Sequence, residues 1–270
     1  MDALLHFGFL QRALLAGIFI AVACAVLGVF LVLRKDAMIG DGLSHVAFAG
    51  VALGLVLNIL PLAAALVVSV GGAFGIMRLK ARAGLHGDTA IGIYSSLGMA
   101  VGILLATLAG DFNVDLLSYL FGEILAIEPF EVWLSLALAG LIIAAVAVHY
   151  SELMFMTFDR ESARASGVAV GRLDALLTVL TAVTVVLGMK VVGVLLVAAL
   201  VVIPAAAGLQ AAASFRKAII ISSAVSVSSV VLGLGLALAL DIPASAAIVI
   251  IAFLAFGGLA LLNRRRKGFL

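Results

Sequence analysis

Residues 34–60 read RKDAMIGDGLSHVAFAGVALGLVLNIL. Two cations, Arg34 and Lys35, precede an apolar segment that is long enough to form a membrane-spanning helix. The segment nevertheless contains a carboxylate and an imidazole, Asp41 and His45, which share one face of a helix because they are four residues apart. Ionisable side chains are costly inside a bilayer, so an Asp/His pair in such a span indicates a functional site.

The composition places the chain in a membrane. Hydrophobic residues make up 66% of the 270 positions and charged residues 11%, whereas soluble domains carry roughly 25% charged residues. A soluble enzyme is therefore excluded. The single cysteine, Cys24, excludes an intrachain disulfide and a zinc site made of thiolates. We expect one transmembrane domain over residues 1–270, with residues 1–33 retained as the first span rather than removed as a signal peptide.

Apolar runs account for most of the chain. Most are near the roughly 20 residues that a spanning helix needs. They cover residues 10–33, 38–60, 61–79, 89–110, 130–149, 173–189, 191–213, 218–240 and 243–262. Two boundaries are weakly marked, because only Pro61 separates the second run from the third and only Lys190 the sixth from the seventh. The predicted fold is an all-α polytopic membrane protein with about nine transmembrane helices, within a range of eight to ten.

The basic residues predict the orientation. With nine spans and the N-terminus outside, all but two of the 16 Lys and Arg residues lie on the cytoplasmic side, the exceptions being Arg12 and Lys190. This asymmetry follows the positive-inside rule, so we expect an external N-terminus and a cytoplasmic C-terminus. The same arrangement places an acidic group outside, between the fourth and fifth spans: Asp111, Asp115, Glu123, Glu128 and Glu131.

A segment on the predicted cytoplasmic side, at about residues 151–172, carries the signals of a short helix. Asp159 is suited to cap a helix that starts at Arg160, Glu161 would lie in its first turn, and Gly167 would end it. Such a helix is too short and too charged to cross the bilayer. Two interpretations are open: it docks an ATPase partner, or it is a solvated connector.

Asp41 and His45 have the chemistry of half a metal site. A carboxylate oxygen and an imidazole nitrogen suit a divalent cation such as zinc or manganese. The alternative is that Asp41 merely caps the N-terminus of its helix while His45 binds a backbone carbonyl. The other histidines are weaker candidates, because they lie in a loop or at the edges of runs: His6, His86 and His149.

Two further patterns concern helix packing. Glycines recur four residues apart at positions 50 and 54, 71 and 75, and 98 and 102, a spacing that lets helix backbones approach closely. They form either a dimer or gating seam or ordinary packing inside one subunit. Pro204 lies in mid-span and is predicted to kink or unwind its helix.

Three stretches carry a resemblance to a known family. They are GDGLSH at residues 40–45 with its flanks from Leu33 to Gly50, FDRESARASGV at 158–168, and VGVLLVAALVVIPAAAG at 192–208. Together with LFGEIL at 120–125, their order and spacing resemble the membrane subunits of bacterial zinc and manganese ABC importers, the ABC-3 metal-ion permeases of cluster A-I. The similarity runs nearly end to end, and GDGLSH is its most specific part.

The resemblance implies a type II-like ABC importer permease in the bacterial cytoplasmic (inner) membrane. In such permeases the residues equivalent to Asp41 and His45 contact the cation in transit. The family's cytoplasmic coupling helix corresponds to residues 158–168, and the positions that match its pattern are Phe158, Asp159, Glu161, Ala163 and Gly167. The metal ion would be cargo, and no permanently bound cofactor is expected.

The resemblance also implies partners. These permeases work as homodimers on two ATP-binding subunits, and a periplasmic or surface-tethered metal-binding protein delivers the ion. Because the sequence contains no GxxxxGK[ST] phosphate-binding loop, we expect ATP hydrolysis in a separate subunit rather than here. The remaining partner is the lipid bilayer, and no nucleic acid is expected.

Other functions explain less of the sequence. A stand-alone proton-coupled carrier could use Asp41 and His45 as a proton relay, but such carriers often contain inverted repeats, and no convincing repeat is seen. An ABC permease for iron–siderophore or cobalamin needs a wide path, whereas the Asp/His pair favours a bare ion. The same ligands suit zinc, manganese and iron(II), so the residues do not choose among these ions. The resemblance to the family favours zinc, with manganese and iron(II) as alternatives.

Overall fold

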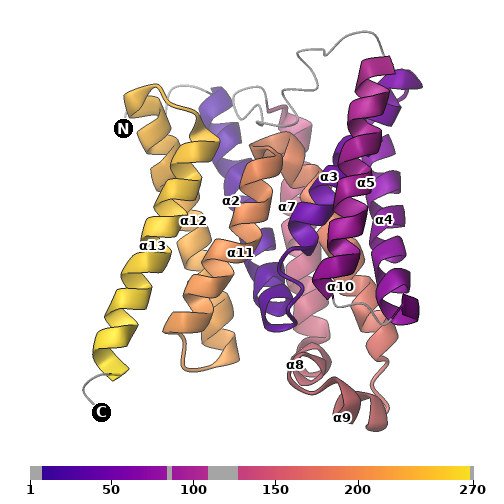
Figure 1. The fold of residues 1–270 in the computed structure, drawn as a ribbon. Coiled ribbons are helices and arrows are strands. Elements are labelled where there is room, and N and C mark those ends of the chain that lie inside the picture. Colours follow the sequence, from indigo (N-terminus) through magenta and orange to yellow (C-terminus); the bar gives the residue numbers. More distant parts are fainter. Residues whose placement is uncertain (1–7, 84–86, 109–126, 268–270) are drawn as a thin grey trace.

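The computed structural model describes residues 8–83, 87–108 and 127–267. Within these residues the chain is folded into α-helices and contains no β-strand (Figure 1). The helices are α2 (Gly8–Leu33), α3 (Ile39–Val56), α4 (Pro61–Ala83), α5 (Gly87–Leu108), α7 (Pro129–Val148), α8 (Tyr150–Phe158), α9 (Arg160–Ala165), α10 (Val170–Val192), α11 (Val194–Ala211), α12 (Phe215–Leu240) and α13 (Ala244–Lys267).

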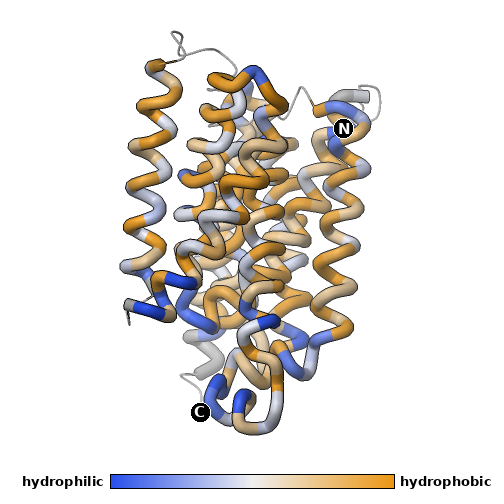
Figure 2. Tube along the Cα trace, turned by 90° about the vertical axis from the view of Figure 1, so that its right-hand side faces the viewer, coloured by the Kyte–Doolittle hydropathy of each residue, from blue (hydrophilic) through white to orange (hydrophobic). Residues whose placement is uncertain are grey.

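The long helices form one bundle. Nine helices in the described part of the chain are long and apolar enough to cross a membrane, which confirms the predicted number. The short helices α8 and α9 lie together at one end of the bundle, where α13 also ends (Figure 1). Apolar residues extend along the bundle, and many hydrophilic residues gather at that same end (Figure 2). The bundle therefore has two chemically different ends.

The end of α3 differs from the prediction. The helix ends at Val56 rather than near Leu60. Asn58 adopts a left-handed φ of 53°, and the amide of Ile59 donates to the carbonyl of Gly54 at 3.0 Å. This pattern satisfies the last carbonyls of a helix and stops it. Pro61 does begin the next helix, as its fixed φ favours.

The boundary between the sixth and seventh spans was also misplaced. Lys190 lies in the last turn of α10, which continues to Val192. The break falls at Gly193, whose φ of 89° is strained for any residue with a side chain. Farther along, Pro204 lies inside α11, which continues to Ala211, so the predicted unwinding does not occur.

The first of the three glycine pairs, Gly50 and Gly54, packs α3 against α4 within one chain. A Cβ atom on Gly50 would lie 2.6 Å from the Cα of Ala65, and one on Gly54 would lie 2.7 Å from the Cα of Pro61, both on α4. Such distances mean that α3 and α4 touch through their backbones. The interpretation as ordinary packing inside the subunit is therefore supported for this pair of helices.

The burial pattern positions α3 inside the bundle. α2, α3 and α10 are the most buried spans, whereas α5 and α13 are largely exposed. α3 packs along both α4 and α5 and also touches α10 and α11. Any side chain of α3 that escapes burial is consequently an exception that needs explaining.

Candidate metal half-site and coupling helix

Asp41 and His45 are the side chains of α3 that escape burial in the part of the helix that is otherwise buried. Both lie near the start of α3, at the end of the bundle that carries α8 and α9. With a rise of about 1.5 Å per residue, they stand roughly 3 and 9 Å along the helix. From Ile39 to Ala52 these are the two residues that are not buried. The helix thus hides its apolar side chains and presents its two ionisable ones.

The two side chains are close enough to share an ion. The Nε2 atom of His45 lies 3.9 Å from the Oδ1 atom of Asp41. This is too long for a hydrogen bond, but it is near the roughly 3.4 Å that separates two ligand atoms each about 2.1 Å from a tetrahedral metal ion. The His45 side chain is 22% exposed and that of Asp41 41%. A small rotation would bring both onto one cation.

The structure contradicts the alternative that this pair is a helix cap. The N-cap of α3 is Met38, and no side chain caps the helix. The Asp41 side chain lies in the first turn, while its backbone carbonyl accepts a hydrogen bond from Ser44 Oγ at 2.7 Å. The predicted carbonyl partner of His45 is missing as well, because its Nδ1 atom is buried without a hydrogen-bond partner among the described residues. The imidazole is therefore not held by a structural hydrogen bond.

One chain supplies two ligands. In the part of the chain that the structure describes, no three His, Cys, Asp or Glu side chains are arranged to hold a metal ion together. Protein zinc sites usually have four ligands. The pair is thus a half-site that needs water, a second copy of the chain, or both to complete it.

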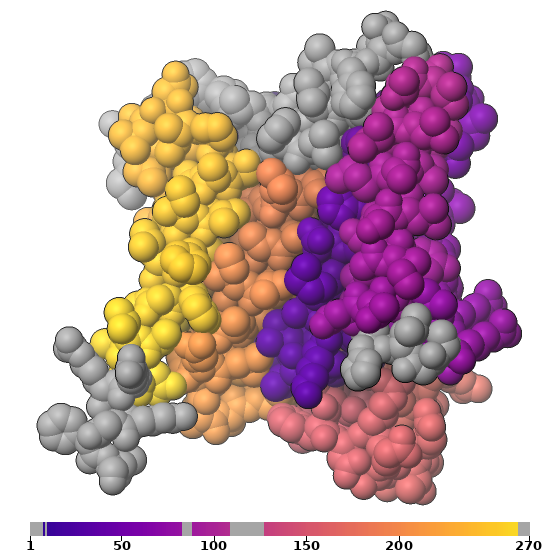
Figure 3. Space-filling view, viewed as in Figure 1, coloured from indigo at the N-terminus to yellow at the C-terminus, as the bar shows by residue number. Residues whose placement is uncertain are grey.

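Neighbouring helices fix the backbone of α3 behind the pair. A Cβ atom on Gly98 of α5 would lie 2.9 Å from both the C and O atoms of His45. On the other side, Gly40 faces Val201 of α11, with a 3.7 Å approach for an added Cβ. Figure 3 shows α3 between α11 and α5 on this face of the molecule. The half-site is therefore mounted on a tightly packed helix rather than on a loop.

The short helix predicted after Asp159 is present. Asp159 caps α9, accepting hydrogen bonds from the amide of Ser162 at 2.9 Å and from its hydroxyl at 2.5 Å. The side-chain and backbone hydrogen bonds from Ser162 lower the pKa of Asp159. Gly167, with φ 86°, ends the helix, and Val168 closes it by donating to the carbonyl of Ala163 at 3.0 Å. The local geometry of this segment is as the sequence predicts.

One residue of α9 is buried against the bundle, and the others are exposed. Ala163 is fully buried, whereas the rest of the helix, including Glu161, is exposed. Phe158, at the end of α8, is 66% exposed although its ring lies 6.0 Å from that of Phe215. A buried small residue anchors the helix, and an exposed aromatic and charged surface faces away from the bundle.

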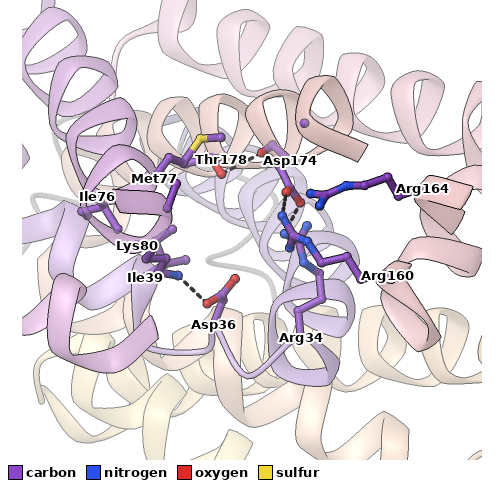
Figure 4. Close-up of a pocket in the computed structure, with 12 residues that line it drawn as sticks. Arg34, Asp36, Ile39, Ile76, Met77, Lys80, Arg160, Arg164, Asp174 and Thr178 are labelled. Atoms are coloured by element: carbon purple, nitrogen blue, oxygen red, sulfur yellow. Dashed lines mark hydrogen bonds and ion pairs between the residues drawn. The ribbon is translucent and has the colours of Figure 1, made fainter. Parts of the chain in front are cut away.

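An ionic cluster that was not predicted joins this helix to the bundle. The carboxylate of Asp174 on α10 accepts hydrogen bonds from Arg34, which follows α2, and from Arg160 of α9 (Figure 4). Nearby, Lys80 Nζ of α4 donates to Asp36 Oδ1 at 2.5 Å. These residues line a pocket of about 440 Å³. The sequence held one signal, since Asp174 is an acid at the start of an otherwise apolar run.

Sequence comparison identifies the family. The profile of the ABC 3 transport family matches residues 6–262. The chain belongs to this family. The manganese transport system membrane protein MntC of Listeria innocua is 34% identical over 186 residues, which cover 68% of this chain and 66% of the relative, just under two thirds of its length. The high-affinity zinc uptake system membrane protein ZnuB of Haemophilus influenzae is 34% identical over 184 residues, 68% of this chain and 70% of that protein.

Solved structures agree with the assignment to the ABC 3 transport family. PsaBC from Streptococcus pneumoniae in complex with Fab aligns with a TM-score of 0.86 and 32% identity, covering 96% of this chain and 93% of that chain. A metal-chelate type ABC transporter in an inward-facing conformation, 16% identical with a TM-score of 0.77, supports the fold alone. The resemblance drawn from the sequence motifs is confirmed.

The other predicted residues that the structure describes lie away from the half-site of this ABC 3 family member. Asp111, Asp115 and Glu123 fall outside the described residues. Glu128 is the N-cap of α7 in a capping box with Glu131, and the Glu131 side chain pairs with Lys190 at the opposite end of the bundle from α9. His149 ends α7, with its Nδ1 atom 3.1 Å from the carbonyl of Ala145. Among the described residues, the structure brings neither these two glutamates nor His149 together with Asp41.

Proposed function

We propose that the chain is the permease subunit of an ATP-driven importer of divalent transition-metal ions, with Asp41 and His45 as ligands of the ion in transit. Membership of the ABC 3 transport family supports transport, and relatives named for manganese and zinc support the class of cargo. The observation that carries the proposal is the exposure of the Asp/His pair on a stretch of α3 that is otherwise buried.

The proposed orientation puts the end with α8 and α9 in the cytoplasm of a bacterial cell, with the N-terminus outside the cytoplasmic membrane. Basic residues at that end, including Arg34, Lys80 and Arg160, support it through the positive-inside rule. Residues 1–270 would then form a single transmembrane permease domain. In this orientation an imported ion crosses most of the bilayer before it reaches Asp41.

Two copies of the chain would complete the ion site. One chain offers an oxygen and a nitrogen ligand, so a homodimer that brings two α3 helices together supplies four. Partly exposed ligands of this kind would bind an ion loosely enough to release it, as a transit site requires.

The exposed surface of α8 and α9 is the proposed docking site for an ATP-binding subunit, so that a homodimer would bind two. Phe158 and Glu161 are exposed there, Ala163 anchors the helix, and the Asp159 cap and Gly167 set its ends. ATP hydrolysis belongs to those partners, and a periplasmic or surface-tethered binding protein would deliver the metal to the opposite end. Movement of α9 would then open and close the path.

The identity of the metal is the finer part of the proposal. The resemblance to the family favours zinc over manganese and iron(II) by a narrow margin, although the ligand residues suit all three. Manganese is the second candidate because several relatives, MntC and ScaB among them, are named for it. Carboxylate and imidazole ligands accept either ion, so delivery and geometry select between them.

A proton-coupled carrier is the rival from another class, with Asp41 and His45 as a proton relay. The test is metal uptake in cells that lack their own importers and express this permease with its ATPase and binding protein. Wild type is compared with Asp41→Ala and His45→Ala, using zinc, manganese and iron in parallel and checking membrane abundance. The proposal predicts ATP-dependent uptake that both variants lose at normal abundance. Uptake without the ATPase would support the carrier instead.

A further inference from the structure

Asp174 occupies a junction of three segments. Its side chain is 7% exposed, and its two oxygens accept from different arginines, Oδ1 from Arg34 and Oδ2 from Arg160. Arg34 lies in the connection between α2 and α3, and Arg160 is the first residue of α9. A single buried side chain thus links the exposed cytoplasmic-end helix to the segment that leads into the half-site (Figure 4).

The segment from Arg34 to α3 is stiff. Lys35 adopts a left-handed φ of 59°, and the amide of Asp36 donates to the carbonyl of Leu31 at 2.8 Å, which closes the end of α2. The carbonyl of Asp36 in turn accepts from the amide of Ile39 at 3.0 Å, at the start of α3. Because each end of this turn is hydrogen-bonded, a displacement of Arg34 displaces the first turn of α3, which contains Asp41.

The two ion pairs of Asp174 differ in strength. The Arg34 side chain is 10% exposed and that of Arg160 is 50% exposed. Breaking a buried pair strands a charge and is costly, whereas a pair with one half-exposed partner contributes little. Arg34 and Asp174 therefore stay together, while Arg160 can leave and return. The adjoining pocket of about 440 Å³ gives its side chain room to move.

We propose that Asp174 is a positioning residue for transport, which transmits the position of α9 through Arg160 and Arg34 to the ion ligands on α3. This inference rests on the proposed function. When α9 moves with the ATPase, the Arg160–Asp174 contact changes, and the Arg34–Asp174 pair carries the change to the start of α3. A second ion pair, between Lys80 and Asp36, keeps the turn attached to α4. It thereby limits the motion to the route through Arg160, Asp174 and Arg34.

The experiment uses the complete complex of permease, ATPase and binding protein in liposomes. Arg160→Gln removes the ion pair between Arg160 and Asp174, while Asp174 keeps Arg34 as the partner of its buried charge. Arg78→Gln is the matched control, because Arg78 is an exposed arginine on α4, outside the proposed docking surface of α8 and α9, and has no ion pair among the described residues. Asp174→Asn removes both links, and Asp174→Glu is the conservative variant that retains the charge.

Two measurements are made. The first is metal uptake per ATP hydrolysed. The second needs no metal: Met38, the half-exposed N-cap of α3, is replaced by cysteine, and its rate of maleimide labelling is compared with and without ATP. The natural Cys24 is buried and gives little background.

For Arg160→Gln we expect normal assembly with the ATPase and continuing ATP hydrolysis. Uptake per ATP and the ATP-dependent change in labelling should each fall roughly tenfold, within the usual range of coupling between sites. Arg78→Gln should match wild type, and Asp174→Glu should recover part of what Asp174→Asn loses.

Two results overturn the proposal. One is an Arg160→Gln complex that transports metal and is labelled at the same rates as Arg78→Gln. The other is loss of ATPase assembly in Arg160→Gln, which would make Arg160 a docking residue. A wild-type complex that shows the labelling change but moves no metal would instead reject the proposed function. The comparison of labelling between wild type and Arg160→Gln would then still decide whether α9 controls the position of α3.

Discussion

The Nε2 atom of His45 lies one helical turn from the Oδ1 atom of Asp41, at 3.9 Å, on the one strip of α3 that is not buried before Leu53. The rest of that turn is sealed by contacts with neighbouring helices. Gly98 of α5 packs against the backbone of His45, and Val201 of α11 lies beside Gly40. The chemistry of the pair and the packing behind it can therefore be perturbed separately.

Replacing Gly98 tests the packing. In Gly98→Ala the new Cβ would lie 2.8–2.9 Å from backbone atoms of Val46 and His45, which cannot yield as a side-chain tip can. We expect α5 to be pushed away from α3 at a cost of about 1–3 kcal/mol in stability, with reduced metal uptake. Thermal unfolding in detergent and uptake measure the two effects.

The control for that experiment lies on the same helix. An added Cβ on Gly92 meets no atom within 4 Å, so Gly92→Ala should be neutral or should stabilise α5 by up to about 1 kcal/mol. Equal melting temperatures for the Gly98 and Gly92 variants would contradict the close contact between α5 and His45.

Removing Arg34 tests the ionic cluster. In Arg34→Gln the buried Asp174 keeps one partner, the half-exposed Arg160, and we expect a loss of roughly 3 kcal/mol or more in unfolding free energy. In Arg160→Gln the buried pair survives, and the loss should be below about 1 kcal/mol. Thermal unfolding of the two variants side by side measures the difference. Similar destabilisation by both variants would show that the two ion pairs contribute equally, which contradicts the prediction.

The capping carboxylate of α9 gives a pH prediction. Hydrogen bonds from Ser162 lower the pKa of Asp159 in the folded chain. The stabilisation of α9 is therefore fully present above the ordinary carboxyl pKa of 3.8 and is lost only as the pH falls below that value. Between pH 5 and pH 8 protection of the Ser162 amide from hydrogen exchange, corrected for the intrinsic rate, should not depend on pH.

Substitution separates the cap from the charge. Asp159→Ala should increase exchange at Ser162 and weaken ATPase binding, whereas Asp159→Asn, which can still accept the amide hydrogen bond, should retain most of both. Unchanged protection in Asp159→Ala would mean that the tertiary burial of Ala163 alone holds α9.

The sequence sufficed for features that depend on local or averaged properties. The spans follow from long apolar runs, and α9 follows from a capping Asp159 and a terminal Gly167, both of which act within a few residues. The predicted helix ends were wrong where a residue with a positive φ ends the helix, as at Asn58 and Gly193. At Lys190 the charge wrongly predicted the break between two spans. This lysine lies in the last turn of α10, where its side chain pairs with Glu131.

The tertiary link between α9 and α3 could not be predicted. Arg34 and Asp174 are 140 residues apart, and each has several opposite charges nearer in sequence. The Asp/His pair itself was predictable because both residues share one helix. Its exposure was not, since that depends on how α4, α5, α10 and α11 surround α3.

The most direct measurement of the central claim is ATP-driven metal uptake into liposomes by the purified complex, with zinc and manganese supplied separately. Asp41→Asn and His45→Gln are compared with Asp88→Asn, a first-turn aspartate on α5, and with His149→Gln, whose ring lies beside a backbone carbonyl. We predict that both half-site variants lose uptake while both controls retain it, and that the transported metal identifies the cargo. Uptake by Asp41→Asn and His45→Gln at the level of the controls would contradict the assignment of these residues to the ion's path.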